Sequence, residues 1–173
     1  MARFRRDPGT FKIDYALSAP VPWRTPPPYA PGTVHISDST EELVTTFAQL
    51  SVGSIPNRPF LLMGQMTTAD PTRSPSGTES LWAYTHVPQW VRGDAGGNLT
   101  GAWDTAEAER FADRMQSRIE EQAPDFSARI INRRILTPLE LERSDASLIG
   151  GSVNGGTAAL DQQLIFRPIP CLG

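Results

Sequence analysis

The stretch 58–88 constrains the fold most, because two dense apolar runs flank a loop of turn-forming residues. Residues 60–66 are apolar on both faces, as in a strand covered on both sides, and residues 80–87 are rich in β-favouring side chains. Between them, Asp70-Pro71 and the run 74–77 (Ser-Pro-Ser-Gly) break any regular pattern. The sequence therefore predicts a long-looped antiparallel hairpin in the middle of a sheet.

Further strands and helices are predicted on both sides of this hairpin. Apolar and polar residues alternate over 11–17, the period of a strand with one buried face. Residues 33–36, 128–136 and 164–166 read as shorter strands. Helices are predicted where capping residues precede a 3.6-residue apolar period, at 40–52, 104–124 and 138–143. The pattern predicts an α+β domain with a mostly antiparallel sheet covered by about two to three helices.

Two of these helices carry apolar stripes that we expect to face the body of the domain. In the first, Leu43, Val44, Phe47 and Leu50 share one face, so the helix should lie on the sheet. Capping boxes are expected at Ser39 with Glu42 and at Asp104 with Glu107. The proline-rich connection 19–33 should be stiff and extended, with Trp23 and Tyr29 anchoring it.

Composition excludes several classes of protein. A length of 173 residues suits one domain, and a net charge of −3 without a basic stripe gives no reason to expect nucleic acid. The single cysteine, Cys171, excludes an internal disulfide and a cysteine metal cluster. No apolar run approaches the roughly 20 residues of a membrane span, and no signal peptide is evident, so we expect a soluble, cytoplasmic protein.

The residues alone indicate no catalytic group. His35 and His86, without cysteine support, are better explained as hydrogen-bonded structural histidines than as metal ligands, and no metal site is predicted. No spacing pairs two acids, and no serine has a nucleophile-elbow setting. The glycine pairs at 150–151 and 155–156 could approach a phosphate, but they match neither dinucleotide fingerprint nor P-loop. A flexible return loop is the simpler interpretation.

Several segments in order resemble the phytoene dehydrogenase-like NAD(P)/FAD-dependent oxidoreductases. They are FKIDYALSAPVPW, GQMTTADPTRSPSGTESLWAYTHVP, WDTAEAERFADRMQSRIEEQAPDF, ILTPLELE and GGSVNGG, spanning roughly residues 8–170. The resemblance implies the substrate-side domain of such an enzyme, similar to that of amine oxidase and phytoene desaturase-type enzymes. In the family this antiparallel sheet lies over FAD and encloses a hydrophobic, often isoprenoid-like or carotenoid-like substrate, and hydride passes to or from the flavin.

The sequence departs from the family pattern where FAD would be held. Neither the glycine-rich Rossmann turn nor the second glycine-rich flavin segment is present. The resemblance thus implies a fragment that is inactive alone and binds no FAD by itself. Residues 1–9 are predicted to be a disordered or added start, 10–143 the substrate-type domain, and 144–173 a return segment toward the missing FAD domain.

The resemblance also suggests a substrate-lining set, partners and a rival function. The candidate lining residues come from the two hairpin strands and the late glycine-rich loop: Leu62, Gly64, Trp82, Tyr84, His86, Asn154, Gly155 and Gly156. Core packing is the competing explanation for each apolar one. The expected partners are a hydrophobic small molecule, the FAD-binding domain and a second copy bound through the flavin-facing surface. The alternative function is a stand-alone hydrophobic-ligand-binding or self-associating module without catalysis.

Overall fold

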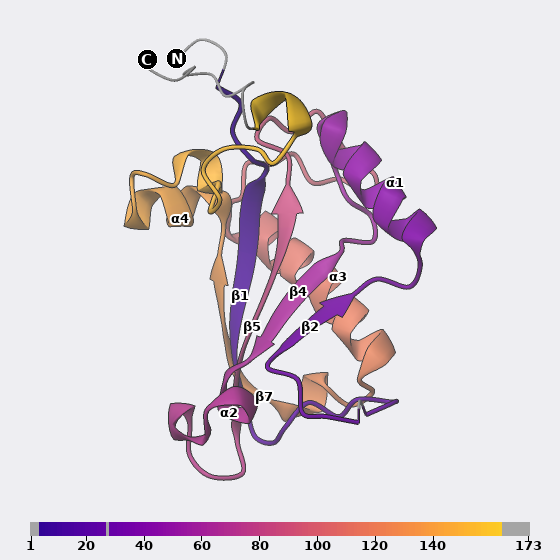
Figure 1. Ribbon diagram of the computed structural model, residues 1–173, viewed down its shortest axis with the longest axis vertical. Coiled ribbons are helices and arrows are strands. Elements are labelled where there is room, and N and C mark those ends of the chain that lie inside the picture. Colours follow the sequence, from indigo (N-terminus) through magenta and orange to yellow (C-terminus); the bar gives the residue numbers. More distant parts are fainter. Residues whose placement is uncertain (1–3, 27, 164–173) are drawn as a thin grey trace.

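A computed structural model describes residues 4–26 and 28–163 as an α+β fold built on a five-stranded antiparallel sheet (Figure 1). The strand order is β2-β4-β5-β1-β7. Their bounds are β1 Gly9–Leu17, β2 Thr33–Ile36, β4 Leu61–Gln65, β5 Glu79–Val87 and β7 Ile130–Leu136. The α-helices are α1 Thr40–Ser51, α2 Met66–Ala69, α3 Thr105–Gln122 and α4 Pro138–Ser144. A separate parallel pair joins β3 Ser54–Ile55 to β6 Gly93–Asp94.

The predicted central hairpin is confirmed. Strands β4 and β5 pair antiparallel, with Leu62 opposite Tyr84 and Gly64 opposite Trp82. Strand β5 is the middle strand, and β1 pairs with it from Gly9 opposite Val87 onward. The expectation that β4 is covered on both sides is only half right, since Leu62 stays partly exposed.

The core lies on one face of the sheet, under α3. Every second residue of β1, from Phe11 to Leu17, is buried, as are Leu61, Met63, Leu81 and Ala83 of the neighbouring strands. The Phe11 ring meets Phe111 of α3 edge to face, with centroids 4.9 Å apart. In Figure 1, α3 crosses behind the sheet, and no helix of the described residues crosses in front of it. The buried alternate side chains of β1 thus pack against the apolar face of α3 in one core.

The predicted N-caps form, but the full capping box occurs only at α4. Thr137 Oγ1 accepts from the Glu140 amide, and the Glu140 carboxylate accepts from the Thr137 amide. Asp104 caps α3 by accepting from the Glu107 amide. The Glu107 carboxylate, however, accepts from the Thr100 and Gly101 amides of the loop directly before the helix. Ser39 likewise caps α1, but the Glu42 carboxylate accepts from the Asp38 amide and not from the Ser39 amide. The sequence prediction of two further capping boxes was therefore half right.

The expectation that the apolar stripe of α1 lies on the main sheet is wrong. Val44 is 63% exposed and Phe47 49% exposed, while the buried residue of the helix is Thr46. The Thr46 hydroxyl donates to the Arg58 carbonyl oxygen at 3.0 Å. The helix packs against β3, and its inward side combines the buried Thr46 with the half-buried Leu43 and Leu50.

Of the two predicted anchors of the proline-rich connection, only one holds. The Trp23 indole N–H donates to the Gln65 side-chain oxygen at 3.0 Å, whereas Tyr29 is 83% exposed. The glycine-rich loop before α3 is tied down by Asp94, which accepts from Gly96 and Leu99 amides and pairs with Arg114. The predicted strand at 164–166 lies outside the described residues, and the predicted domain boundaries stay predictions.

Candidate functional site

The hairpin residues predicted to line a substrate share one face of the sheet. Because side chains alternate along a strand, the even-numbered residues of β4 and β5 point away from the core. This surface, which we call the open face, carries Leu62, Gly64, Trp82, Tyr84 and His86. The structure therefore brings these candidates together, on the side of the sheet opposite α3.

An aromatic ladder runs along the centre of the open face. The Trp82 and Tyr84 rings stack at 5.7 Å with an interplanar angle of 18°, and His86 meets Tyr84 edge-on at 5.8 Å. The Trp82 indole also lies against Gly64, and its N–H points to the Met66 sulfur at 3.1 Å. Stacked rings on a half-exposed strand offer a flat apolar platform.

The predicted loop residues lie at the end of the sheet near the start of β1, where Asp7 holds them. The Asn154 side-chain amide donates to the Asp7 carboxylate at 2.6 Å, and the Asp7 amide donates to the Gly155 carbonyl at 3.2 Å. Gly156 forms an isolated bridge with Arg6. The same aspartate lies close enough to Tyr84 and His86 to influence both. Asp7 thus links the loop candidates to the ladder.

At the His86 end of the ladder, the surroundings favour the neutral forms of His86 and Tyr84. Burial lowers the pKa of His86, and this effect outweighs the opposing influence of Asp7. Burial also raises the pKa of Tyr84, and Asp7 adds to the rise. Thr10, which lies opposite His86, has a buried hydroxyl, and neither it nor His86 Nδ1 has a hydrogen-bond partner among the described residues. Two neighbouring buried polar atoms without a hydrogen-bond partner among the described residues therefore lie at this end of the ladder.

A lysine and an aspartate border the ladder on β1. Lys12 lies opposite Tyr84 and Asp14 opposite Trp82, and the two charged groups pair with each other. Their mutual neutralisation leaves the aromatic ladder as the dominant feature of this surface. Among the described residues, no group of three or more histidine, cysteine or acidic side chains could hold a metal ion.

A hollow of about 520 Å³ between α3 and α4 is a weaker candidate. Its lining includes Trp103, Arg133, Ile135, Leu139 and Glu140. Arg133 is already paired with Glu109 at 2.5 Å and with Asp113 at 2.7 Å. Arg133 is thus engaged in holding β7 to α3 and Glu140 in capping α4, which explains these two charged groups without a ligand.

Sequence reasoning missed Asp7 and Thr10. The alternation over residues 11–17 could have identified Thr10. If the strand starts one residue earlier, Thr10 falls on the same face as Lys12 and Asp14, which is the open face. Asp7 lies in the segment interpreted as a disordered or added start. No local pattern relates it to Asn154, which is 147 residues away in sequence.

Comparison with known proteins finds relatives named as oxidoreductases. The chain is 30% identical over 139 residues to "Pyridine nucleotide-disulfide oxidoreductase domain-containing protein 2" of Rattus norvegicus, and equally to that of Mus musculus. Each match covers 80% of this chain and 23% of the relative, so the chain spans less than a quarter of these proteins. No protein-family model matches the chain.

The comparisons agree with the sequence reading at the level of an oxidoreductase. Within the described residues, no helix combines the length and apolarity that crossing a membrane requires.

Proposed function

We propose that this chain is the substrate-side domain of an FAD-dependent oxidoreductase of the phytoene dehydrogenase-like kind. In this proposal the open face forms one wall of a site for a hydrophobic, isoprenoid-like substrate. The observation that carries the proposal is the ladder of Trp82, Tyr84 and His86 on a sheet face that no helix of residues 4–26 and 28–163 covers. Such a surface can bind and orient an extended apolar molecule without charged contacts.

The gradient along the ladder supports an oriented substrate. At one end Trp82 lies against Gly64 and Met66, with Asp14 neutralised by Lys12 on its other side, whereas the His86 end has Thr10 and Asp7. An amphipathic substrate with one polar end would place that end near His86 and lay its chain along the rings. These residues would bind and orient the substrate and exclude water from it.

The described residues do not fit the pyrophosphate of FAD. A phosphate cradle needs free backbone amides at a helix start after a strand. Gly150 and Gly151 have positive φ, but a Cβ atom there would meet Gln89 Oε1 at 2.0 Å and Pro138 Cα at 2.6 Å. The space beside these glycines is therefore filled by the protein itself. In the proposal, FAD is held by a separate flavin-binding domain, as the resemblance implies.

The test is to sequence the reading frame on both sides of the segment that encodes residues 1–173, and to express the whole frame. The proposal predicts an upstream G-x-G-x-x-G after a strand, a downstream glycine-rich segment, and a purified product with the visible absorbance of bound flavin. A start signal directly before Met1 and a stop directly after Gly173 would overturn the enzyme proposal. That outcome would favour the rival function, a stand-alone module for hydrophobic ligands.

A further inference from the structure

Helix α1 turns part of its apolar stripe away from the protein, while Leu43 and Leu50 are half-buried. Its outward face contains Val44, Phe47 and Ala48, all exposed. The strip continues past the helix end to Val52, which is 63% exposed, and to Trp90, which is 82% exposed. Val52 and Trp90 line one groove of about 430 Å³, whose lining also includes Arg6 and Arg92. We call this set of residues the α1 strip.

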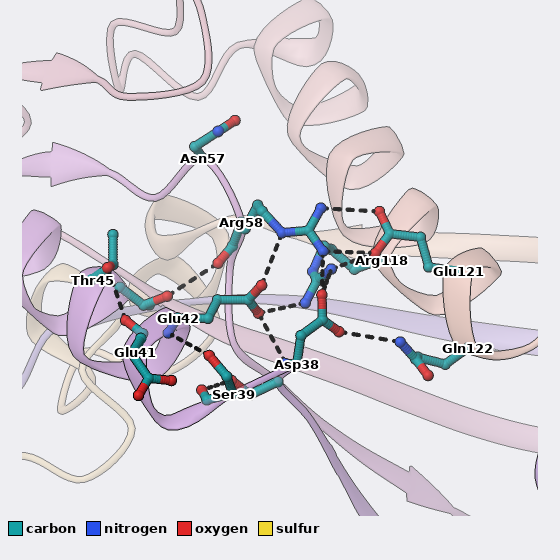
Figure 2. A network of polar contacts seen from close by, with 12 residues as sticks. Asp38, Ser39, Glu41, Glu42, Thr45, Asn57, Arg58, Arg118, Glu121 and Gln122 are labelled. Carbon is teal, nitrogen blue, oxygen red and sulfur yellow. Dashed lines mark hydrogen bonds and ion pairs between the residues drawn. The ribbon is translucent and has the colours of Figure 1, made fainter.

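A buried network of ion pairs fixes this orientation of the helix (Figure 2). Glu42, on the inward face of α1, accepts from Arg58 at 2.8 Å and from Arg118 of α3 at 2.5 Å. The Arg118 side chain is only 3% exposed. Rotating α1 to bury Phe47 would pull Glu42 out and leave Arg118 buried with fewer partners, which is costly. The exposed strip is therefore a stable feature of the fold.

Charges stand at both ends of the strip. Glu41, in the first turn of α1, is fully exposed on the outward face. At the other end, the Arg92 side chain lies against Gly53, just beyond the last turn, and a Cβ atom on Gly53 would be 3.0 Å from Arg92 Cγ. Arg92 has no ion-pair partner among the described residues. The strip thus has a negative start and a positive end.

We propose that the α1 strip is the interface with a second copy of this chain, paired antiparallel about a twofold axis that passes through the outward face of α1 between Val44 and Ala48. In that arrangement Phe47 packs against Val44 and Ala48 of the other copy, and the small Ala48 side chain lets the helices approach closely. Glu41 of each copy then faces the helix end of the other, beside Arg92. A twofold interface must be self-complementary, and this charge order satisfies that condition.

The test is sedimentation velocity of the chain over about 1 to 100 µM, the range of a modest interface. The proposal predicts a dimer that Phe47→Glu weakens at least tenfold. Glu41→Arg or Arg92→Glu alone should each weaken it several-fold, and the double variant should restore it, because the two charges exchange places. Circular dichroism confirms that each variant is folded, and Ile131→Glu, on the exposed part of β7, is the matched control that leaves the dimer intact.

Three outcomes would overturn the proposal. One is a monomer across the whole range, and another is a dimer that survives Phe47→Glu. The third is a dimer that Tyr84→Glu dissociates and Phe47→Glu does not. That last result would place the interface on the open face, as the family resemblance suggests.

Discussion

The Trp82 indole occupies the space where residue 64 would carry a side chain. A Cβ atom on Gly64 would lie 2.2 Å from Trp82 Cε2, closer than real Cβ contacts allow. The glycine on β4 therefore sets the position of the first ring of the ladder on β5. This cross-strand pair connects the sheet register to the surface proposed to bind substrate.

Gly64→Ala should displace the Trp82 ring and destabilise the protein. The added methyl group overpacks a closed site, which typically costs about 1 to 3 kcal/mol in the free energy of unfolding. Urea unfolding measures the loss, and the indole N–H resonance of Trp82 should shift as its contact with Met66 changes. Gly93→Ala is the matched control, because a Cβ atom there meets nothing within 4 Å. Equal stability of the two variants would contradict this packing.

Arg118→Met should be among the most destabilising substitutions in the chain. It removes the buried partner of Glu42 and Glu121 and leaves them only the half-exposed Arg58 as a cation, a loss of about 1 to 3 kcal/mol. Thermal unfolding provides the measurement. Arg110→Met, on an exposed position of the same helix, should change the stability by less than about 0.5 kcal/mol. A small effect at both positions would mean that the network in Figure 2 contributes little.

Glu107→Gln should destabilise the protein and make its free energy of unfolding less dependent on pH in the acid range. The carboxylate accepts from the Thr100 amide at 2.7 Å, the Thr100 hydroxyl at 2.8 Å, and the Gly101 and Trp103 amides. Burial alone would raise its pKa, but these bonds outweigh burial and lower the pKa of Glu107. Ionised Glu107 therefore adds to the free energy of unfolding at pH values above the ordinary glutamate pKa. This stabilisation is lost as the pH falls through the lowered pKa that Glu107 has in the folded protein.

The check on Glu107 is a series of urea unfolding curves from neutral to acid pH. Glu107→Gln should lower the free energy of unfolding by about 1 to 3 kcal/mol at neutral pH. The difference in this free energy between the variant and the parent should disappear at acid pH. A gap that is constant with pH would show that the effect is not electrostatic.

The pKa of His86 should lie below the usual histidine range. Burial disfavours the charged ring, and Asp7 opposes this only in part. Asp7→Asn should therefore lower the pKa of His86 further. Because the unfolded chain takes up the proton first, His86 should reduce stability as pH falls through the ordinary histidine range. NMR titration of the His86 imidazole in the parent and in Asp7→Asn measures this directly, and a raised pKa at His86 would contradict it.

The hairpin and α3 were predictable because their signals are local. Alternating residues in β1, the β-favouring run in β5 and the Asp104 cap each specify one element, and strand parity places Leu62 and Trp82 on a common face. The orientation of α1 was not predictable from its apolar stripe. It depends on Arg118, which is 76 residues from Glu42, and on the Arg58 carbonyl that binds Thr46. A buried ion pair of this kind overrides amphipathic patterning, and the sequence has no local sign of it.

The most direct test of the open face is an NMR titration of the chain with geranylgeraniol, a long isoprenoid alcohol, in ¹H–¹⁵N correlation spectra. The account predicts the largest shifts at the Trp82 indole N–H and at the amides of Leu62, Gly64 and Tyr84, and their loss in Trp82→Ala. Absence of shifts there, or shifts confined to Val44 and Phe47 on the α1 strip, would contradict the claim that the open face binds an apolar substrate.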